Sequence, residues 1–176
     1  DRVHLAEFFG GTTADELSLV TPDFFDRTGI TCHLGAKAIH VDRDKRQIQL
    51  SSGDIVVYDR LVLATGSYPF VPPIPGNDRG FSFVYRTIED LEAIRDAGRQ
   101  SRVGVVIGGG LLGLEAANAL RQMGLETHGV EFAPRLMAMQ IDEWGGLLLK
   151  QKIEELGVKV HTSRATTAII DGESCR

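Results

Sequence analysis

The stretch VGVVIGGGLLGLEAANAL, residues 103–120, decides how this chain folds. An apolar run of strand length, 103–107, meets a cluster of glycines, and a helix-forming run then continues to Gly124. This change from strand to helix around glycines is typical of a turn that binds a phosphate. The spacing GxGxxG falls on Gly108, Gly110 and Gly113.

Each of these glycines has its own task in such a turn. Gly108 permits the tight turn, Gly110 leaves room for a pyrophosphate, and Gly113 lets the helix pack closely against the strand. The free N–H groups and partial positive charge of the helix amino end then face the phosphates. A glycine-rich turn that binds nothing is the alternative, but the flanking strand and helix favour a dinucleotide.

Two acidic residues and one arginine follow the glycines. Glu131 ends the next strand, 23 residues after Gly108, where a carboxylate accepts hydrogen bonds from an adenosine ribose. This carboxylate would repel a 2′-phosphate and favours NAD, whereas Arg135 could accommodate that phosphate; NADP is therefore the less favoured cofactor. Glu115 is expected in the first helical turn. A favourable charge at the helix end and a group beside the nicotinamide are equal alternatives for it.

The elements around this turn alternate in type. Amphipathic or capped patterns predict helices, and short apolar runs predict strands. The expected order from residue 87 is helix 87–100, strand 103–107, helix 111–123, strand 126–131, helix 142–156 and strand 158–161. The last five elements form β-α-β-α-β, so we expect an α/β fold with a parallel sheet and right-handed crossovers.

The residues before this unit are richer in strand patterns. The runs that predict strands are 30–35, 36–42, 47–50, 55–58 and 60–66, the last apolar on both faces like a buried parallel strand. A proline-rich connector follows at 68–76. The predicted organisation is a first domain at 1–76, a connector and helix at 77–101, and a second domain at 102–176.

Composition excludes several classes of function. The net charge of −5 argues against a nucleic-acid surface, and no apolar run approaches the roughly 20 residues needed to span a membrane. Cys32 and Cys175 lie far apart, which argues against a disulfide framework and favours a cytoplasmic location. The five histidines lack metal-ligand spacing, so no metal site is predicted.

The segment LVLATGSYPFVPPIPG, from Leu61, resembles the Ala-Thr-Gly segment of two-dinucleotide flavoprotein reductases, the pyridine nucleotide-disulfide oxidoreductases. In that family this strand closes against FAD, and a proline-rich stretch leads to an inserted NAD domain. Further stretches, including DRVHLAEFF, FVYRTIEDLEAI, VEFAPRLM and LGVKVHTS, are similar to the N-terminal reductase region of NADH-dependent nitrite reductase large subunits. The fold implied is a Rossmann-like NAD-binding domain, in which helices cover both faces of a parallel sheet, plus a partial FAD-binding domain.

The resemblance assigns cofactor contacts residue by residue. Those implied for FAD are Asp1, Arg2, Ala38, Thr65, Gly66 and Arg86. Those implied for NADH are Gly108, Gly110, Leu112, Gly113, Glu131 and Arg135. Glu115 would sit at the junction of nicotinamide and flavin, as the candidate catalytic residue.

The family's N-terminal FAD fingerprint and its later FAD segment are not found in these residues, so the chain is expected to be an internal segment, inactive alone. The implied reaction is hydride transfer from NADH to FAD. Electrons would pass to iron–sulfur and siroheme centres outside this segment, in the same chain or a small subunit, reducing nitrite to ammonium. The alternatives are a ferredoxin- or rubredoxin-type reductase and a non-enzymatic nucleotide-binding module. Homo-oligomerisation is left open.

Overall fold

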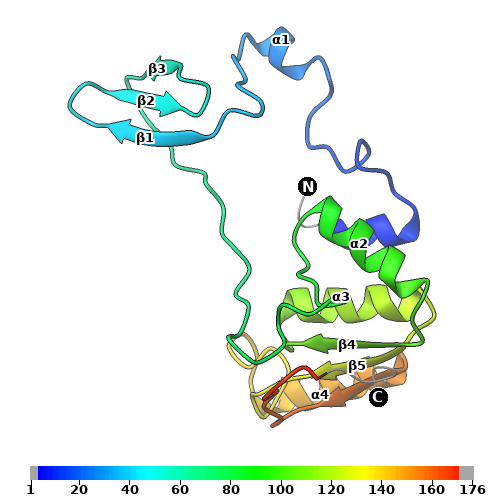
Figure 1. Ribbon diagram of the computed structural model, residues 1–176. Coiled ribbons are helices and arrows are strands. Elements are labelled where there is room, and N and C mark those ends of the chain that lie inside the picture. Colours follow the sequence, from blue (N-terminus) through cyan, green and yellow to red (C-terminus); the bar gives the residue numbers. More distant parts are fainter. Residues whose placement is uncertain (1–3, 171–176) are drawn as a thin grey trace. The chain divides into compact units, whose positions relative to one another are not determined.

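The computed structural model describes residues 4–170 and divides them into two compact units (Figure 1). The larger unit comprises residues 4–18 and 69–170, and the smaller unit is Leu19–Tyr68. The larger unit therefore joins an N-terminal piece to a segment that begins at residue 69.

A three-stranded parallel sheet forms the centre of the larger unit. The strands β4 (Val103–Ile107), β5 (Glu126–Val130) and β6 (Val158–His161) lie in this spatial order. The helices α3 (Leu111–Gln122) and α4 (Glu143–Glu155) connect them (Figure 1). The predicted β-α-β-α-β order and the Rossmann-like α/β fold are confirmed. In the described residues both connecting helices pack on one face of the sheet, whereas Val105 and Ile107 on the other face are 52% and 44% exposed, so the expected helices on both faces are seen on one face.

The main core lies between the sheet and these two helices. Its buried and partly buried members are Ala117, Leu136, Val158, Val160, Val106, Leu114, Leu149 and Ile153. Val158 and Val160 are buried while Lys159 and His161 between and after them are exposed, which is the alternation of a sheet with one covered face. Full burial of one such aliphatic side chain contributes about 1.5–3 kcal/mol.

A second, smaller core joins α2 (Ile88–Gly98) to the 3-10 helix η1 (Leu5–Gly10). Its buried residues are Leu5, Phe8, Leu17 and Leu91. A capping box begins α2: the Thr87 side chain accepts a hydrogen bond from the Asp90 N–H, and the Asp90 carboxylate accepts one from the Thr87 N–H. Within residues 4–170, no helix has the length and apolar character required to cross a membrane.

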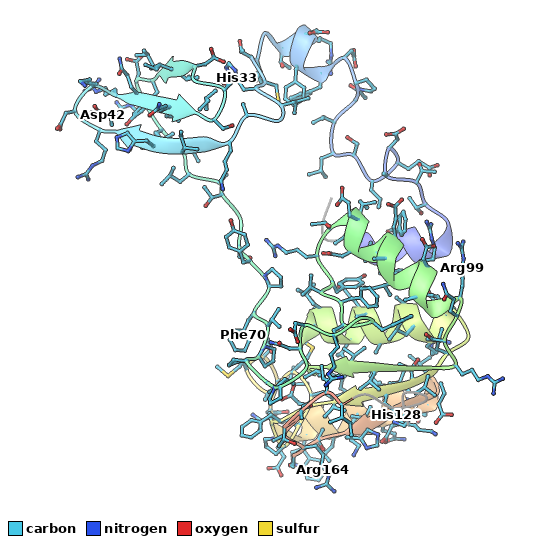
Figure 2. All side chains as sticks on the ribbon, in the orientation of Figure 1. His33, Asp42, Phe70, Arg99, His128 and Arg164 are labelled. Atoms are coloured by element: carbon cyan, nitrogen blue, oxygen red, sulfur yellow. The ribbon has the colours of Figure 1, made fainter. Side chains whose placement is uncertain are left out.

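The smaller unit contains an antiparallel sheet. The strands β1 (Ala38–Asp42), β2 (Gln47–Leu50) and β3 (Ile55–Val57) pair in sequence order, and the short helix α1 (Phe24–Thr28) precedes them. Asp42 lies at the turn between β1 and β2, where its carboxylate accepts hydrogen bonds from two turn N–H groups (Figure 2). These three strands match the predicted runs.

Two other predicted strands are wrong. Residues 60–66 form no strand, and Val62 and Leu63 are 85% and 71% exposed. Residues 30–35 also form no strand. A strand requires a neighbour for its backbone hydrogen bonds, and no strand in residues 4–170 pairs with either run.

Candidate dinucleotide site

The three parallel strands end at one edge of their sheet. Ile107 pairs with Val130, which pairs with His161, so the chain leaves all three strands side by side. The ladder then continues one step: Gly108 N–H donates to the Val130 carbonyl and Glu131 N–H donates to the His161 carbonyl, both at 2.8 Å. The glycine turn and Glu131 are therefore neighbours at this carboxyl edge.

The glycine turn requires glycine at two of its three motif positions for backbone reasons. Gly108 has φ +117°, a conformation that side chains disfavour. A Cβ on Gly113 would lie 2.0 Å from the Gly108 carbonyl oxygen, because α3 packs against the turn itself. Gly110, the N-cap of α3, is exposed, and a Cβ there would meet nothing within 4 Å. Leu112 follows in the first turn, 52% exposed.

Glu131 is held by the turn that it adjoins. Its Oε2 accepts a hydrogen bond from Gly109 N–H at 2.5 Å, and its Oε1 accepts one from Ala133 N–H at 2.6 Å. Each carboxylate oxygen keeps a further lone pair with which to accept a ribose hydroxyl. The carboxylate is thus oriented by the same peptide that shapes the glycine turn.

Gly109 is a site residue that the sequence motif did not single out. A Cβ there would lie 2.7 Å from Leu136 Cδ2 and 3.0 Å from Glu131 Cβ and Cγ. GxGxxG leaves this position unspecified, so the only signal was the run of three glycines. The close approach of Glu131 and Leu136 explains why a side chain does not fit.

The structure places Arg135 against the loop that precedes α4. Its Nε donates to the Ile141 carbonyl at 3.2 Å, and its Nη2 donates to the Ala138 carbonyl at 3.0 Å. The side chain is half-buried. Of the residues predicted to hold NADH, Arg135 is the one whose side chain is engaged by backbone carbonyls.

Glu115 lies beyond the first turn of α3, which begins at Leu111, so its predicted first-turn position is wrong. Burial raises the pKa of Glu115, whereas the positive end of a helix would lower that pKa. Burial, and then the charge of Glu115, raises the pKa of Tyr85 to about 12. This environment counts against the interpretation of Glu115 as a helix-end charge.

Three buried polar atoms in this region lack hydrogen-bond partners within the described part of the chain. They are Tyr85 Oη, Arg86 Nη2 and Glu115 Oε2. Buried polar atoms are normally paired, so unpaired ones call for an explanation such as a bound ligand. They provide donors and an acceptor for a polar group.

The other residues predicted to contact FAD are spread over the chain. Asp1 and Arg2 lie outside the described residues. Ala38, Thr65 and Gly66 belong to the smaller unit, where all three are exposed. Their assignment to FAD stays a prediction.

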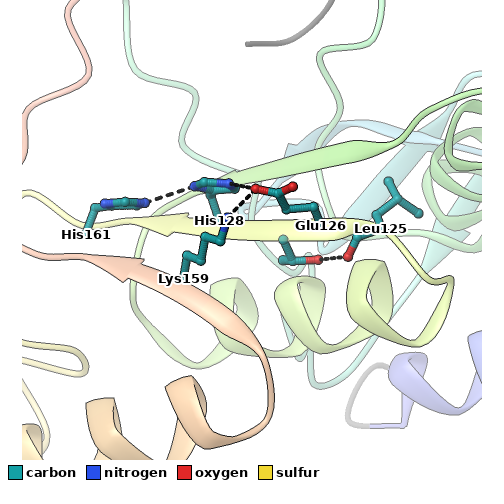
Figure 3. Close-up of polar contacts among 6 residues, drawn as sticks. Leu125, Glu126, His128, Lys159 and His161 are labelled. Atoms are coloured by element: carbon teal, nitrogen blue, oxygen red, sulfur yellow. Dashed lines mark hydrogen bonds and ion pairs between the residues drawn. The ribbon is translucent and has the colours of Figure 1, made fainter.

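A polar chain crosses the sheet face opposite the main core (Figure 3). His128 Nδ1 lies 3.0 Å from His161 Nε2, and His128 Nε2 lies 3.1 Å from Glu126 Oε1, which also pairs with Lys159. The two imidazole rings are nearly parallel. Within residues 4–170, no three His, Cys, Asp or Glu side chains are grouped to bind a metal ion.

A parallel sheet with a glycine turn at its carboxyl edge, and a carboxylate at the end of the next strand, defines a dinucleotide-binding domain of the Rossmann type. The family model of pyridine nucleotide-disulphide oxidoreductases matches residues 11–175. The chain belongs to this family.

The chain spans about a fifth of the length of the nitrite reductase large subunits that it matches. It is 57% identical to a nitrite reductase [NAD(P)H] large subunit of Klebsiella oxytoca and 54% identical to a nitrite reductase (NADH) large subunit of Escherichia coli K12. These matches cover 98% and 97% of this chain but 18% and 20% of the relatives. A ferredoxin reductase from Rhodopseudomonas palustris superposes with a TM-score of 0.89 at 28% identity, over 99% of this chain and 43% of that one.

Proposed function

We propose that this chain is the NADH-binding, flavin-reducing part of an NADH-dependent nitrite reductase. Membership of the family implies binding of FAD and NAD(P)H. The two relatives of highest identity described above are nitrite reductase large subunits. Iron–sulfur and siroheme centres beyond this chain would receive the electrons and reduce nitrite to ammonium.

The arrangement of Glu131 and Gly109 is the observation that carries this proposal. The Glu131 carboxylate accepts the Gly109 N–H and thereby stands beside the backbone that would bind the pyrophosphate. It can accept the ribose hydroxyls of NADH and would repel the 2′-phosphate of NADPH. Gly108, Gly110, Leu112 and Gly113 would supply the backbone that contacts the phosphates.

The unpaired buried polar atoms of Tyr85, Arg86 and Glu115 fit the edge of a flavin or nicotinamide ring. Arg86 Nη2 would donate to a ring oxygen or nitrogen, and Glu115 would face the junction of the two rings. Burial keeps the Glu115 side chain in a setting that disfavours its charge. A bound FAD would supply the capacity to accept a hydride and pass electrons onward. In this proposal Thr65 and Gly66, within a first domain at 1–76, serve the flavin.

Anaerobic reduction of the complete polypeptide that contains these residues tests the proposal. NADH, but not NADPH at equal concentration, is expected to bleach the visible flavin bands, and ammonium is expected to form from nitrite. Reduction of the flavin without nitrite consumption, together with transfer to ferredoxin or rubredoxin, would instead identify a reductase whose acceptor is a separate protein. Flavin bands that NADH leaves unchanged would contradict the proposed NADH entry.

A further inference from the structure

Arg135 fastens the loop between β5 and α4. The guanidinium bonds the carbonyls of Ile141 and Ala138, which both belong to this loop. An arginine can bond two carbonyls at once because its donors are held in a rigid plane, whereas a lysine offers a single flexible ammonium. The guanidinium donors that make these two bonds are thus used within the chain.

Helix α4 provides the surface on which the arginine lies. A Cβ on Gly146 would lie 2.8 Å from Arg135 Cδ and 2.9 Å from Arg135 Cβ. Gly146 is buried in the first half of the helix, and glycine there costs helix stability relative to alanine. The glycine therefore serves the fit of the Arg135 stem against the helix backbone.

The fastened loop reaches the glycine turn. Met137 N–H donates to the Gly109 carbonyl at 2.9 Å, while Leu136, 2% exposed, packs against Gly109. Met137 has φ +47°, a left-handed conformation that is unfavourable for a residue with a side chain. Such a conformation persists only where surrounding contacts impose it. The two Arg135 hydrogen bonds span Met137, because they join residue 135 to the carbonyls of residues 138 and 141.

We propose that Arg135 is a positioning residue for the dinucleotide site and leaves the dinucleotide itself untouched. It holds the 136–141 loop, the loop holds the Gly109 carbonyl through Met137, and Glu131 holds the Gly109 N–H. Gly109, the central residue of the turn, is thus hydrogen-bonded through both its N–H and its carbonyl before any nucleotide binds. Insofar as it concerns NADH, the inference rests on the proposed function. It further implies that Arg135 makes no contact with the 2′-phosphate of NADPH.

Three substitutions in the complete polypeptide test this role. Arg135→Met removes the charge and both hydrogen bonds, Arg135→Lys keeps the charge, and Gly146→Ala displaces the arginine while leaving its charge in place. Arg102→Met, an exposed residue before β4, is the matched control. Hydrogen exchange without nucleotide is expected to accelerate about tenfold or more at the amides of Gly109 and Met137 in all three variants, but not in the control.

Steady-state kinetics distinguish a residue that positions the dinucleotide site from a residue that contacts the dinucleotide. The KM for NADH is expected to rise in all three variants, with kcat per bound flavin unchanged and the ratio of NADPH to NADH use unchanged in Arg135→Met. Simple loss of folded protein would lower activity without raising KM. A rise of KM in Arg135→Met alone, rescue by lysine, or unchanged hydrogen exchange would overturn the inference. Because exchange is measured without nucleotide, it tests the clamp even if the wild-type protein fails to bind NADH.

Discussion

The replacement Glu131→Gln tests the centre of the candidate site. The two carboxylate oxygens accept different backbone N–H groups, those of Gly109 and Ala133, at 2.5 and 2.6 Å. A glutamine has one acceptor oxygen and one NH₂ donor, so one of the two backbone N–H groups must face another donor. Hydrogen bonds to a charged group contribute about 1.5–3 kcal/mol each, and losing one leaves an unsatisfied N–H.

This loss predicts a local opening of the turn that is about ten- to hundredfold more frequent. Hydrogen exchange of the Gly109 and Ala133 amides in the nucleotide-free complete polypeptide measures it, with exposed Glu92→Gln as the matched control. The dissociation constant for NADH should rise by at least about tenfold, while that for NADPH should rise less because its 2′-phosphate is no longer repelled. Exchange and NADH affinity both within twofold of wild type would refute the reasoning.

Three further predictions concern other parts of the larger unit. Gly113→Ala should abolish NADH binding in a titration, because its Cβ would meet the Gly108 carbonyl at 2.0 Å, whereas Gly129→Ala, whose Cβ would meet nothing within 4 Å, should bind normally. Glu115→Gln should stabilise α3 at neutral pH. Because burial raises the pKa of the Glu115 carboxyl, this group supports the folded state below its ordinary pKa of 4.5, and that contribution to stability is lost as the pH rises through the raised pKa. A difference in α3 hydrogen exchange between wild type and Glu115→Gln that is the same at pH 4 and pH 7 would contradict this prediction. Thr87→Ala should lower the stability of α2 by about 0.5–2 kcal/mol in hydrogen exchange, with Thr87→Ser close to wild type; equal losses in both would exclude the cap.

Local patterns were sufficient to predict most elements of the larger unit. Helical periodicity located α2, and glycine spacing located the start of α3. The strand runs with glycines between them predicted the parallel sheet, because short βαβ connections leave few alternatives. The incorrect strand prediction also has a physical cause. The apolar run at 60–66 has the composition of a strand, but no other strand pairs with it within the described residues.

The sequence by itself determined the glycine turn, the acidic end of β5 and the α/β order, because these depend on backbone freedom and on periods of a few residues. Only the tertiary structure decided what surrounds them. Gly109 must be glycine since Leu136 and Glu131 approach it, and Arg135 lies on the loop since Gly146 of α4 leaves room. Burial raises the pKa of Glu115, whereas the sequence left a helix-end charge and a group beside the nicotinamide as equal alternatives. Such contacts join residues distant along the chain, and no local pattern encodes the distances between them.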